Sequence, residues 1–359
     1  MRKYLKALTV PGKMVADSSE DEILSLARRI FPKEMVEGTG ITVPTFVDDC
    51  SVIKLELIGD NSELVITADV LVENEDFQLE WMSPYEIGYK SLMVNLSDLA
   101  AMGAEAVGMV VILGLPDRVS MSFVESYLEG LKEPALRHKV MILGGDLSAS
   151  EIIFSSITLF GKVPEGMALR RDGVKEGDVI AVTGNPGEAL AGFEIISRKN
   201  HNVTRAERFF TERFLRPQAR LEEGIVLRNI GGIRGCMDIS DGIARDVSRI
   251  AKLNGLKAII HGELLPASDV LLDYWKKQNR DPIEMIIRGG EDFELLFSCD
   301  EVRFETVKDL VESSNGIKVT RIGEWVEGTG TFVAKLDGSM LDISHWGFDH
   351  FEKKQEVGK

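Results

Sequence analysis

The stretch after Ser83 predicts a helix that carries apolar residues on nearly every side. Ser83 is a good N-cap, Pro84 suits the first helical position, and Glu86 completes a capping box with the serine. Gly103 is a plausible stop for this helix. Because a helix that is apolar all round is typical of a protein interior, we expect this one to be buried.

Asp98 is the exception within that helix. At about 100° per residue, it falls on one side with Ser91 and Val94, while Leu92 and Leu96 lie opposite. An ionised carboxylate in such a place is costly unless a cation or hydrogen-bond donors compensate it. A bound cation would explain Asp98, and so would a role at the helix C-terminus or a salt bridge to a lysine.

The length of the chain, 359 residues, exceeds what one hydrophobic core usually supports, so two domains are expected. Its 44% of hydrophobic and 28% of charged residues are ordinary for a globular protein. Proline, glycine and charged residues replace the apolar periodicity after residue 160, which places the expected boundary near residue 166. The predicted domains are residues 1–166 and 167–359.

Both halves mix predicted helices with predicted strands, which indicates an α+β protein made of two mixed α/β domains, the second with a sheet packed against helices. Helices are expected over residues 20–31, 120–138 and 243–254. Strands are expected over residues 51–58, 64–71, 140–143, 152–160, 178–183 and 286–297, and a polar connection over residues 198–220.

Aspartates recur at strand centres and strand ends, where this residue type is unusual, and also at tight turns. Any one of them is explained by a turn or cap role. As a set they favour a hard divalent cation, because magnesium is bound through oxygen ligands, typically one or two carboxylates together with substrate phosphates. The members are Asp48, Asp49, Asp69, Asp98, Asp146, Asp238 and Asp241.

The charge balance and the missing motifs exclude several other classes. With 58 acidic residues against 42 Lys and Arg, the net charge of −16 disfavours nucleic acid as a partner. No Walker-type GxxxxGK[ST] sequence is present, the five histidines lie in no recognisable nucleophilic context, and the three cysteines fit neither a disulfide framework nor a zinc site. We expect Cys50, Cys236 and Cys299 to be small buried residues.

No apolar stretch approaches the roughly 18 residues of a membrane span, and lysines and a proline break the apolar run near the N-terminus. We therefore expect a cytoplasmic protein with no membrane partner.

Several motifs, taken together and in order, resemble the thiamine-monophosphate kinase family of the aminoimidazole ribonucleotide synthetase-like superfamily. They are NLSDLAAMGA (95–104), GGD (144–146), RRDGVKEGD (170–178), DISDG (238–242), GGEDFEL (289–295) and WGFDHF (346–351). The resemblance covers roughly residues 45–351, and the specific motifs are the first and the last two.

The resemblance implies a kinase that transfers the γ-phosphoryl group of ATP directly, in line, to thiamine monophosphate, with Mg²⁺ as cofactor and no covalent enzyme intermediate. It implies a homodimer paired through the sheet of the first domain, which binds ATP and Mg²⁺, and a second domain that completes the nucleotide and substrate site. The implied metal ligands are Asp49, Thr67, Asp69, Asp98, Asp146, Asp238 and Asp241, of which Asp98, Asp146 and Asp241 would be catalytic. The implied nucleotide contacts are Gly144, Gly145, Asp146, Arg171 and Ser240, and the implied substrate contacts are Asp76, Glu291 and Phe348.

Three positions depart from the family pattern: Val47 and Ala68 replace a glycine and a threonine beside metal ligands, and Asp76 replaces a histidine near the substrate. Two alternatives therefore stay open. Asp76 favours another ATP-dependent enzyme of the same superfamily with a different acceptor. Val47 and Ala68 favour a catalytically weak nucleotide-binding paralogue.

Overall fold

The computed structural model describes residues 13–14, 20–31, 41–43, 52–53, 59–198 and 204–348. The chain forms two compact units. The first comprises Met1–Leu169, Ile196–Lys199 and Leu215–Asn229, and the second comprises Arg170–Ile195, Asn200–Phe214 and Ile230–Lys359. The domain boundary near residue 166 stays a prediction. In the described part of the chain, no helix has both the length and the apolar character that crossing a membrane requires.

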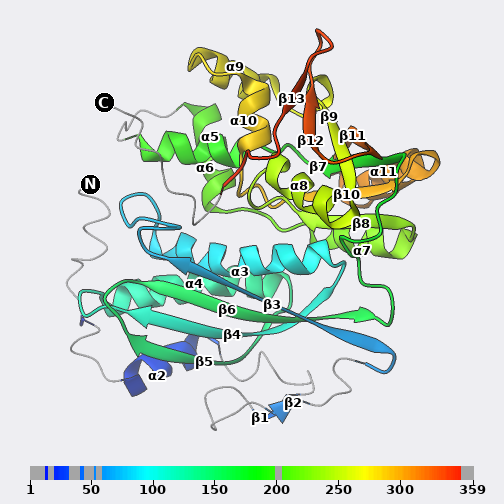
Figure 1. The fold of residues 1–359 in the computed structure, drawn as a ribbon. Coiled ribbons are helices and arrows are strands. Elements are labelled where there is room, and N and C mark those ends of the chain that lie inside the picture. Colours follow the sequence, from blue (N-terminus) through cyan, green and yellow to red (C-terminus); the bar gives the residue numbers. More distant parts are fainter. Residues whose placement is uncertain are drawn as a thin grey trace. The chain divides into compact units, whose positions relative to one another are not determined.

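The first unit is built on a four-stranded sheet whose strand order is β3-β6-β4-β5. Neighbours pair antiparallel except β4 and β5, which are parallel. Helices α3 and α4 cover one face of this sheet (Figure 1). The strands are β3 (Ser62–Val72), β4 (Glu105–Leu115), β5 (Met141–Ala149) and β6 (Phe154–Pro164), with a separate pair β1 (Ile41–Val43) and β2 (Val52–Ile53). The helices are α2 (Glu20–Ile30), α3 (Pro84–Ala101), α4 (Met121–Arg137) and α7 (Leu221–Ile230).

Helix α3 forms as its sequence predicts. The Ser83 side chain accepts from the Glu86 N–H, the Glu86 carboxylate accepts from the Ser83 N–H, and nearly every residue of the helix is buried. Two glycines let α3 and α4 approach closely, because a Cβ on Gly88 would lie 2.0 Å from the carbonyl oxygen of Tyr127, and one on Gly130 would lie 1.9 Å from that of Tyr85. The helix is thereby fixed over β3, where the candidate site lies.

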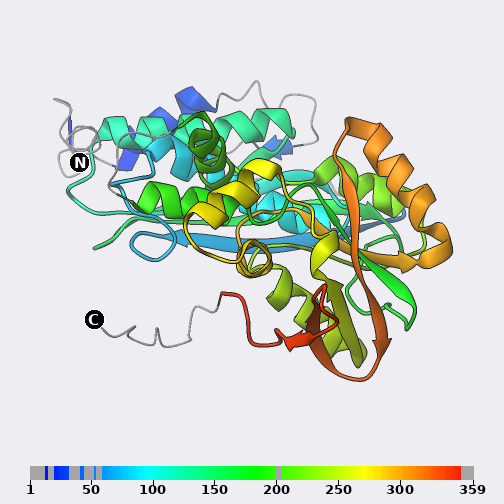
Figure 2. The same ribbon diagram turned by 90° about the horizontal axis from the view of Figure 1, so that it is seen from above.

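The second unit holds a seven-stranded sheet of order β13-β12-β9-β11-β7-β10-β8, antiparallel except for the β12–β9 pair. Seen from above, the orange helix α11 is well separated from the red strand β13 (Figure 2). The strands are β7 (Asp178–Thr183), β8 (Ile233–Asp238), β9 (Leu256–His261), β10 (Leu295–Asp300), β11 (Val319–Glu327), β12 (Gly330–Ala334) and β13 (Met340–Asp342). The helices are α5 (Glu188–Ser197), α6 (Arg205–Leu215), α8 (Ile243–Asn254), α9 (Asp269–Lys277), α10 (Pro282–Arg288) and α11 (Glu301–Asn315), with a 3₁₀ turn at Gly262–Leu264.

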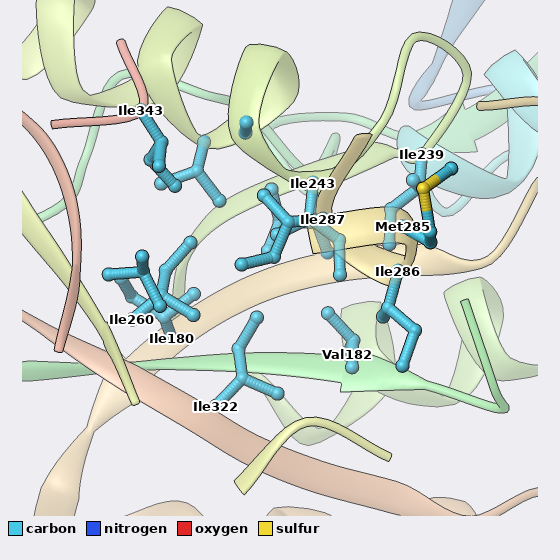
Figure 3. Packing of buried hydrophobic residues seen from close by; sticks show 14 of the residues in the cluster. Ile180, Val182, Ile239, Ile243, Ile260, Met285, Ile286, Ile287, Ile322 and Ile343 are labelled. Atoms are coloured by element: carbon cyan, nitrogen blue, oxygen red, sulfur yellow. The ribbon is translucent and has the colours of Figure 1, made fainter. Parts of the chain in front are cut away.

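The hydrophobic core of the second unit lies between its sheet and helices α8 and α10. Figure 3 shows Ile180, Ile260 and Ile322 of the sheet gathered with Ile243 and Ile287 of these helices. This packing fixes the start of α8, and with it the acidic turn that precedes it.

The prediction of mixed α/β structure in both halves is confirmed. Cys236 and Cys299 are free and buried as predicted, and Cys50 lies outside the described residues. Three local predictions were wrong. Residues 205–215 are a helix rather than a polar connection, residues 286–288 of the expected strand 286–297 belong to a helix, and β5 continues through Asp146 instead of ending before it.

Candidate functional site

Thr67 and Asp98 form a candidate site within the first unit. Thr67 and Asp69 pair with Leu159 and Ile157 of β6, both fully buried on the side of the sheet that faces α3. The Thr67 hydroxyl donates to Asp98 Oδ2 at 2.5 Å. Asp98 is only partly buried although its neighbours on α3 are buried. Two oxygen donors therefore converge where the helix crosses the strand.

Asn95 is a polar residue of this site that the sequence analysis missed. It is fully buried, its Oδ1 accepts from the backbone N–H of Asp69 at 3.1 Å, and its Nδ2 donates to the Ser91 carbonyl. Asn95 therefore ties α3 to the strand that carries Asp69. The available signal was an asparagine one turn before Asp98 in an otherwise apolar helix.

The Gly144-Gly145-Asp146 segment lies inside β5. Gly145 pairs with Val111, and a Cβ there would lie 2.3 Å from the Val111 carbonyl oxygen, so the position has no room for a side chain. The Asp69 row of the sheet runs through Ile157 and Val111 to Gly145. Because adjacent strand residues point to opposite faces, the register does not bring Asp146 together with Asp69 and Thr67.

A separate candidate site, within the second unit, is the turn from Asp238 to Gly242. Asp238 ends β8 and is buried beside Leu295 of β10. The Ser240 carbonyl accepts from the Glu291 N–H at 2.8 Å, and the Ile239 carbonyl accepts from the Phe293 N–H at 2.9 Å. Two predicted contact residues, Ser240 and Glu291, are therefore hydrogen-bonded neighbours.

Glu291 and Phe293 both have left-handed backbones, with φ of 63° and 53°. This conformation is unusual for side chains of their size and costs roughly 1–3 kcal/mol each. It persists because hydrogen bonds to the acidic turn hold both residues. Such strain is typical of functional segments, and here it sits on a predicted substrate contact.

Asp246 and Arg249 of α8 hold Asp241, and both were missed by the sequence analysis. Asp246 is fully buried, and its Oδ2 accepts from the backbone N–H groups of Ser240 and Asp241 at 3.1 Å each. Arg249 bridges Asp246 Oδ1 at 2.8 Å and Asp241 Oδ2 at 2.5 Å. Burial, followed by the charges of Asp238 and Asp241, raises the pKa of Asp246 to about 7.

Two further buried carboxylates follow Glu291. Asp292 accepts from the backbone N–H groups of Gly187 and Ala189 at 2.6 and 3.0 Å, at the start of α5. Burial is the main reason why the pKa of Asp292 rises to about 7. Glu294 has no exposed surface and accepts from the Thr183 hydroxyl and from Arg213. The signal for both was the run of acids in the apolar segment 289–297.

The aromatic tail reaches the acidic turn of the same unit. The Arg288 guanidinium lies 4.0 Å from the centre of the Trp346 ring, a cation–π contact. Phe348 is half exposed. The tail and the acidic turn are joined by a hydrogen bond from the Phe348 N–H to the Asp241 carbonyl.

The other predicted site residues have local roles or lie outside the description. The Asp76 carboxylate accepts from the Val72 N–H at 2.8 Å and so caps the turn at the end of β3. Arg171 is exposed, with its carbonyl bonded to Asn254 Nδ2. Asp49 and Val47 lie outside the described residues.

The donor set fits magnesium. All the acidic and hydroxyl candidates offer oxygen, the ligand type that Mg²⁺ prefers. Across the described ranges, no three His, Cys, Asp or Glu side chains converge into a closed cage. Magnesium does not need such a cage, because it commonly takes one or two carboxylates and completes its shell with water and substrate phosphates.

Two family models match the chain. The AIR synthase related protein N-terminal domain matches residues 47–163, and the C-terminal domain of the same family matches residues 175–335. A thiamine-monophosphate kinase of Aquifex aeolicus is 32% identical over 299 residues, which covers 81% of this chain and 92% of the relative.

Solved structures agree with these matches. A thiamine-monophosphate kinase of Stenotrophomonas maltophilia has a TM-score of 0.76 and 30% identity, covering 89% of this chain and 95% of its own. A structure described as AaThiL complexed with AMPPCP and TMP has a TM-score of 0.73 and 30% identity, covering 92% and 97%.

Proposed function

Since the chain belongs to the thiamine-monophosphate kinases within the AIR synthase related protein family, we infer that it phosphorylates thiamine monophosphate to thiamine diphosphate with ATP. The observation that carries this inference is the 30% identity, over 92% of this chain, to a protein solved with AMPPCP and TMP. AMPPCP is an analogue of ATP, and TMP corresponds to the acceptor.

The reaction is an in-line transfer of the γ-phosphoryl group onto the phosphate of the acceptor. Two unit charges about 4 Å apart repel by about 4 kcal/mol at an effective dielectric near 20, so bringing two phosphorylated reactants together is the main difficulty. The protein has to position the reactants and compensate their charge; it does not need to form a covalent intermediate. The fixed aspartates and the strained Glu291 segment suit that task.

Magnesium would be held by Thr67, Asp69 and Asp98 in the first unit and by Asp238 and Asp241 in the second. When bound, it supplies positive charge that offsets the repulsion between phosphates. The 2.5 Å contact between the Thr67 hydroxyl and Asp98 supports a two-oxygen site there. The register of β5 gives no support to Asp146 as a ligand of the same ion, and Asp49 rests on the resemblance alone.

Different residues are proposed to contact the nucleotide and the phosphoryl acceptor, thiamine monophosphate. The nucleotide contacts are Gly144, Gly145, Arg171 and Ser240, supported at Gly144 by the open space beside its backbone, where a Cβ would meet nothing within 4 Å. The acceptor contacts are Glu291 and Phe348, supported by the strained backbone of the first and the exposed ring of the second. Asp76 has a turn-capping partner in Val72, which accounts for an acid at that position without a change of acceptor.

The proposed assembly is a cytoplasmic homodimer paired through the sheet of the first unit. On the face of that sheet away from α3, β3 exposes Leu64, Ile66 and Val70, and β4 exposes Ile112. A row of exposed aliphatic residues on a sheet supports an interaction surface. The proposed domains, residues 1–166 and 167–359, follow the division between the two matched family models.

The test is to incubate the protein with ATP, Mg²⁺ and thiamine monophosphate and to identify the products by mass. Thiamine diphosphate and ADP in equal amounts are the expected products. ATP consumption only with a different acceptor would replace the proposed substrate, and nucleotide binding without turnover would replace the proposed catalysis.

A further inference from the structure

We propose that Asp246 is a positioning residue that, together with Arg249, presents the Ser240–Asp241 turn to the magnesium nucleotide. This inference rests on the proposed function and adds two residues for which the family match and the motifs supply no role. It concerns the shape of the turn, and it places neither residue in contact with substrate.

The geometry closes a ring around Asp241. Asp246 Oδ2 accepts from the Asp241 backbone N–H at 3.1 Å, Asp246 Oδ1 accepts from Arg249 at 2.8 Å, and Arg249 donates to the Asp241 carboxylate at 2.5 Å. Both the backbone and the side chain of one predicted ligand are therefore fixed by the same pair. Arg245 adds a longer contact of 3.5 Å to Asp241 Oδ2.

The second bond of Asp246 Oδ2 extends this control to the nucleotide contact. Asp246 Oδ2 accepts this bond from the Ser240 N–H at 3.1 Å, while the Ser240 carbonyl accepts from the Glu291 N–H. A single buried carboxylate thus orients two consecutive peptide units that carry the predicted nucleotide and metal contacts. The charged guanidinium of Arg249 donates to both carboxyl groups, and hydrogen bonds with a charged donor are stronger than neutral ones.

If Asp246 only stabilised the start of α8, its bridge through Arg249 to Asp241 would not be needed. Gly242 caps α8 without a side-chain hydrogen bond, and its φ of 107° lets the chain leave the turn directly into the helix. Asp246 lies in the first turn of α8, where its charge also interacts favourably with the helix dipole. The interaction with the helix dipole does not require Arg249. Arg249 links Asp246 to the side chain of Asp241, which lies before the helix.

Residues that orient metal ligands typically change affinity or activity by about 10- to 100-fold when mutated. The probe is Mg²⁺ with AMPPCP, measured by calorimetry without any acceptor, so the result does not depend on thiamine monophosphate. Asp246→Asn is expected to weaken this binding at least about tenfold. Arg249→Lys keeps the charge but cannot bridge two carboxylates with one fork, and it is expected to weaken binding less than Asp246→Asn.

Asp337→Asn is the matched control, because this exposed carboxylate also accepts a backbone N–H, from Ser339 at 2.9 Å, far along the chain in the β12–β13 hairpin. It should bind like the wild type. Arg249 is partly exposed, so Arg249→Lys keeps the test decisive if Asp246→Asn does not fold. If the double variant binds the magnesium nucleotide no more weakly than the weaker-binding of the two single variants, Asp246 and Arg249 act together rather than independently.

Wild-type affinity in both Asp246→Asn and Arg249→Lys would overturn the positioning role. If the wild-type protein itself binds no magnesium nucleotide, the proposed function fails and takes this inference with it. Wild-type binding with unchanged variants overturns the inference alone.

Discussion

The backbone N–H of Phe348 donates a hydrogen bond of 3.1 Å to the carbonyl oxygen of Asp241. This one hydrogen bond joins a residue proposed to contact thiamine monophosphate, Phe348, to a proposed metal ligand, Asp241. Gly347, between the tail tryptophan and Phe348, makes this possible with a φ of 111°. The position of the aromatic tail is therefore coupled to the shape of the acidic turn.

Gly347→Ala is expected to disturb the acceptor site. An alanine there would place its Cβ 2.6 Å from the Cβ of Arg245 in a conformation that costs roughly 1–3 kcal/mol for residues other than glycine. We expect the KM for thiamine monophosphate to rise about tenfold, the equivalent of about 1.4 kcal/mol, with a smaller change in the KM for ATP. Steady-state kinetics with each substrate varied measure this split.

Gly338→Ala is the control for that variant, because Gly338 also has a positive φ but open space around it. It should be strained without an effect on either KM. Equal changes in both variants would mean that backbone strain alone, and not the tail position, explains the kinetics of Gly347→Ala.

Asp98→Asn is expected to lower kcat at least about 100-fold while the protein stays folded, because a charge that compensates the phosphates is lost where the Thr67 hydroxyl converges with it. ADP release over a magnesium titration gives the rates. Asp117→Asn, at an exposed position after β4, should behave like the wild type. Near-wild-type turnover of Asp98→Asn at any magnesium concentration would remove Asp98 from the metal site.

The element boundaries that could be predicted were those set by local chemistry. The capping box of α3, the strand at Asp178–Thr183 and the helix at Ile243–Asn254 all follow from neighbouring residues. The helix at Pro282–Arg288 was missed because its apolar run suggested a strand, although Asp281 caps it and Pro282 starts it. The helix at Arg205–Leu215 was missed because polar residues dominate it, and its buried apolar residues, Phe210, Phe214 and Leu215, lie near its C-terminal end.

The candidate site was predictable as a set of acids but not as a network. Asp238 stood out because an acid at a strand end is unusual, and Asp241 stood out because an aspartate recurs three residues later in the same segment. The partners of Asp292 could not be predicted, since Gly187 and Ala189 lie more than a hundred positions away in the sequence. Such contacts depend on the tertiary fold, and the spacing of motifs along the sequence does not predict them.

The raised pKa of Asp292 predicts a pH-dependent contribution to stability. Burial raises this pKa from 3.8 to about 7, so between these values the folded state holds a proton that the unfolded state has released. Stability from this group therefore falls as pH rises from about 4 to about 7. The difference in unfolding free energy between wild type and Asp292→Asn should shrink over that range.

Urea denaturation at several pH values measures that difference. The N–H groups of Gly187 and Ala189 oppose the effect of burial, because they favour the charged carboxylate. If the stability advantage of the wild type grew with pH instead, these hydrogen bonds would outweigh burial and the pKa of Asp292 would be depressed.

Val70→Glu is expected to weaken the proposed dimer. Val70 is 48% exposed on the face of β3 away from α3, and a buried charge at a paired sheet face is unfavourable. Light scattering after size exclusion should show a larger monomer fraction at low concentration. Leu310→Glu, 46% exposed on α11 of the other unit, is the matched control and should leave the mass unchanged.

The most direct test of phosphoryl transfer to thiamine monophosphate uses ATP that is labelled with ¹⁸O in its γ-phosphoryl group. The whole label is expected in the terminal phosphate of thiamine diphosphate, detected by mass, only when Mg²⁺ and thiamine monophosphate are both present. Label released solely as inorganic phosphate, or transferred only to another acceptor, would contradict it.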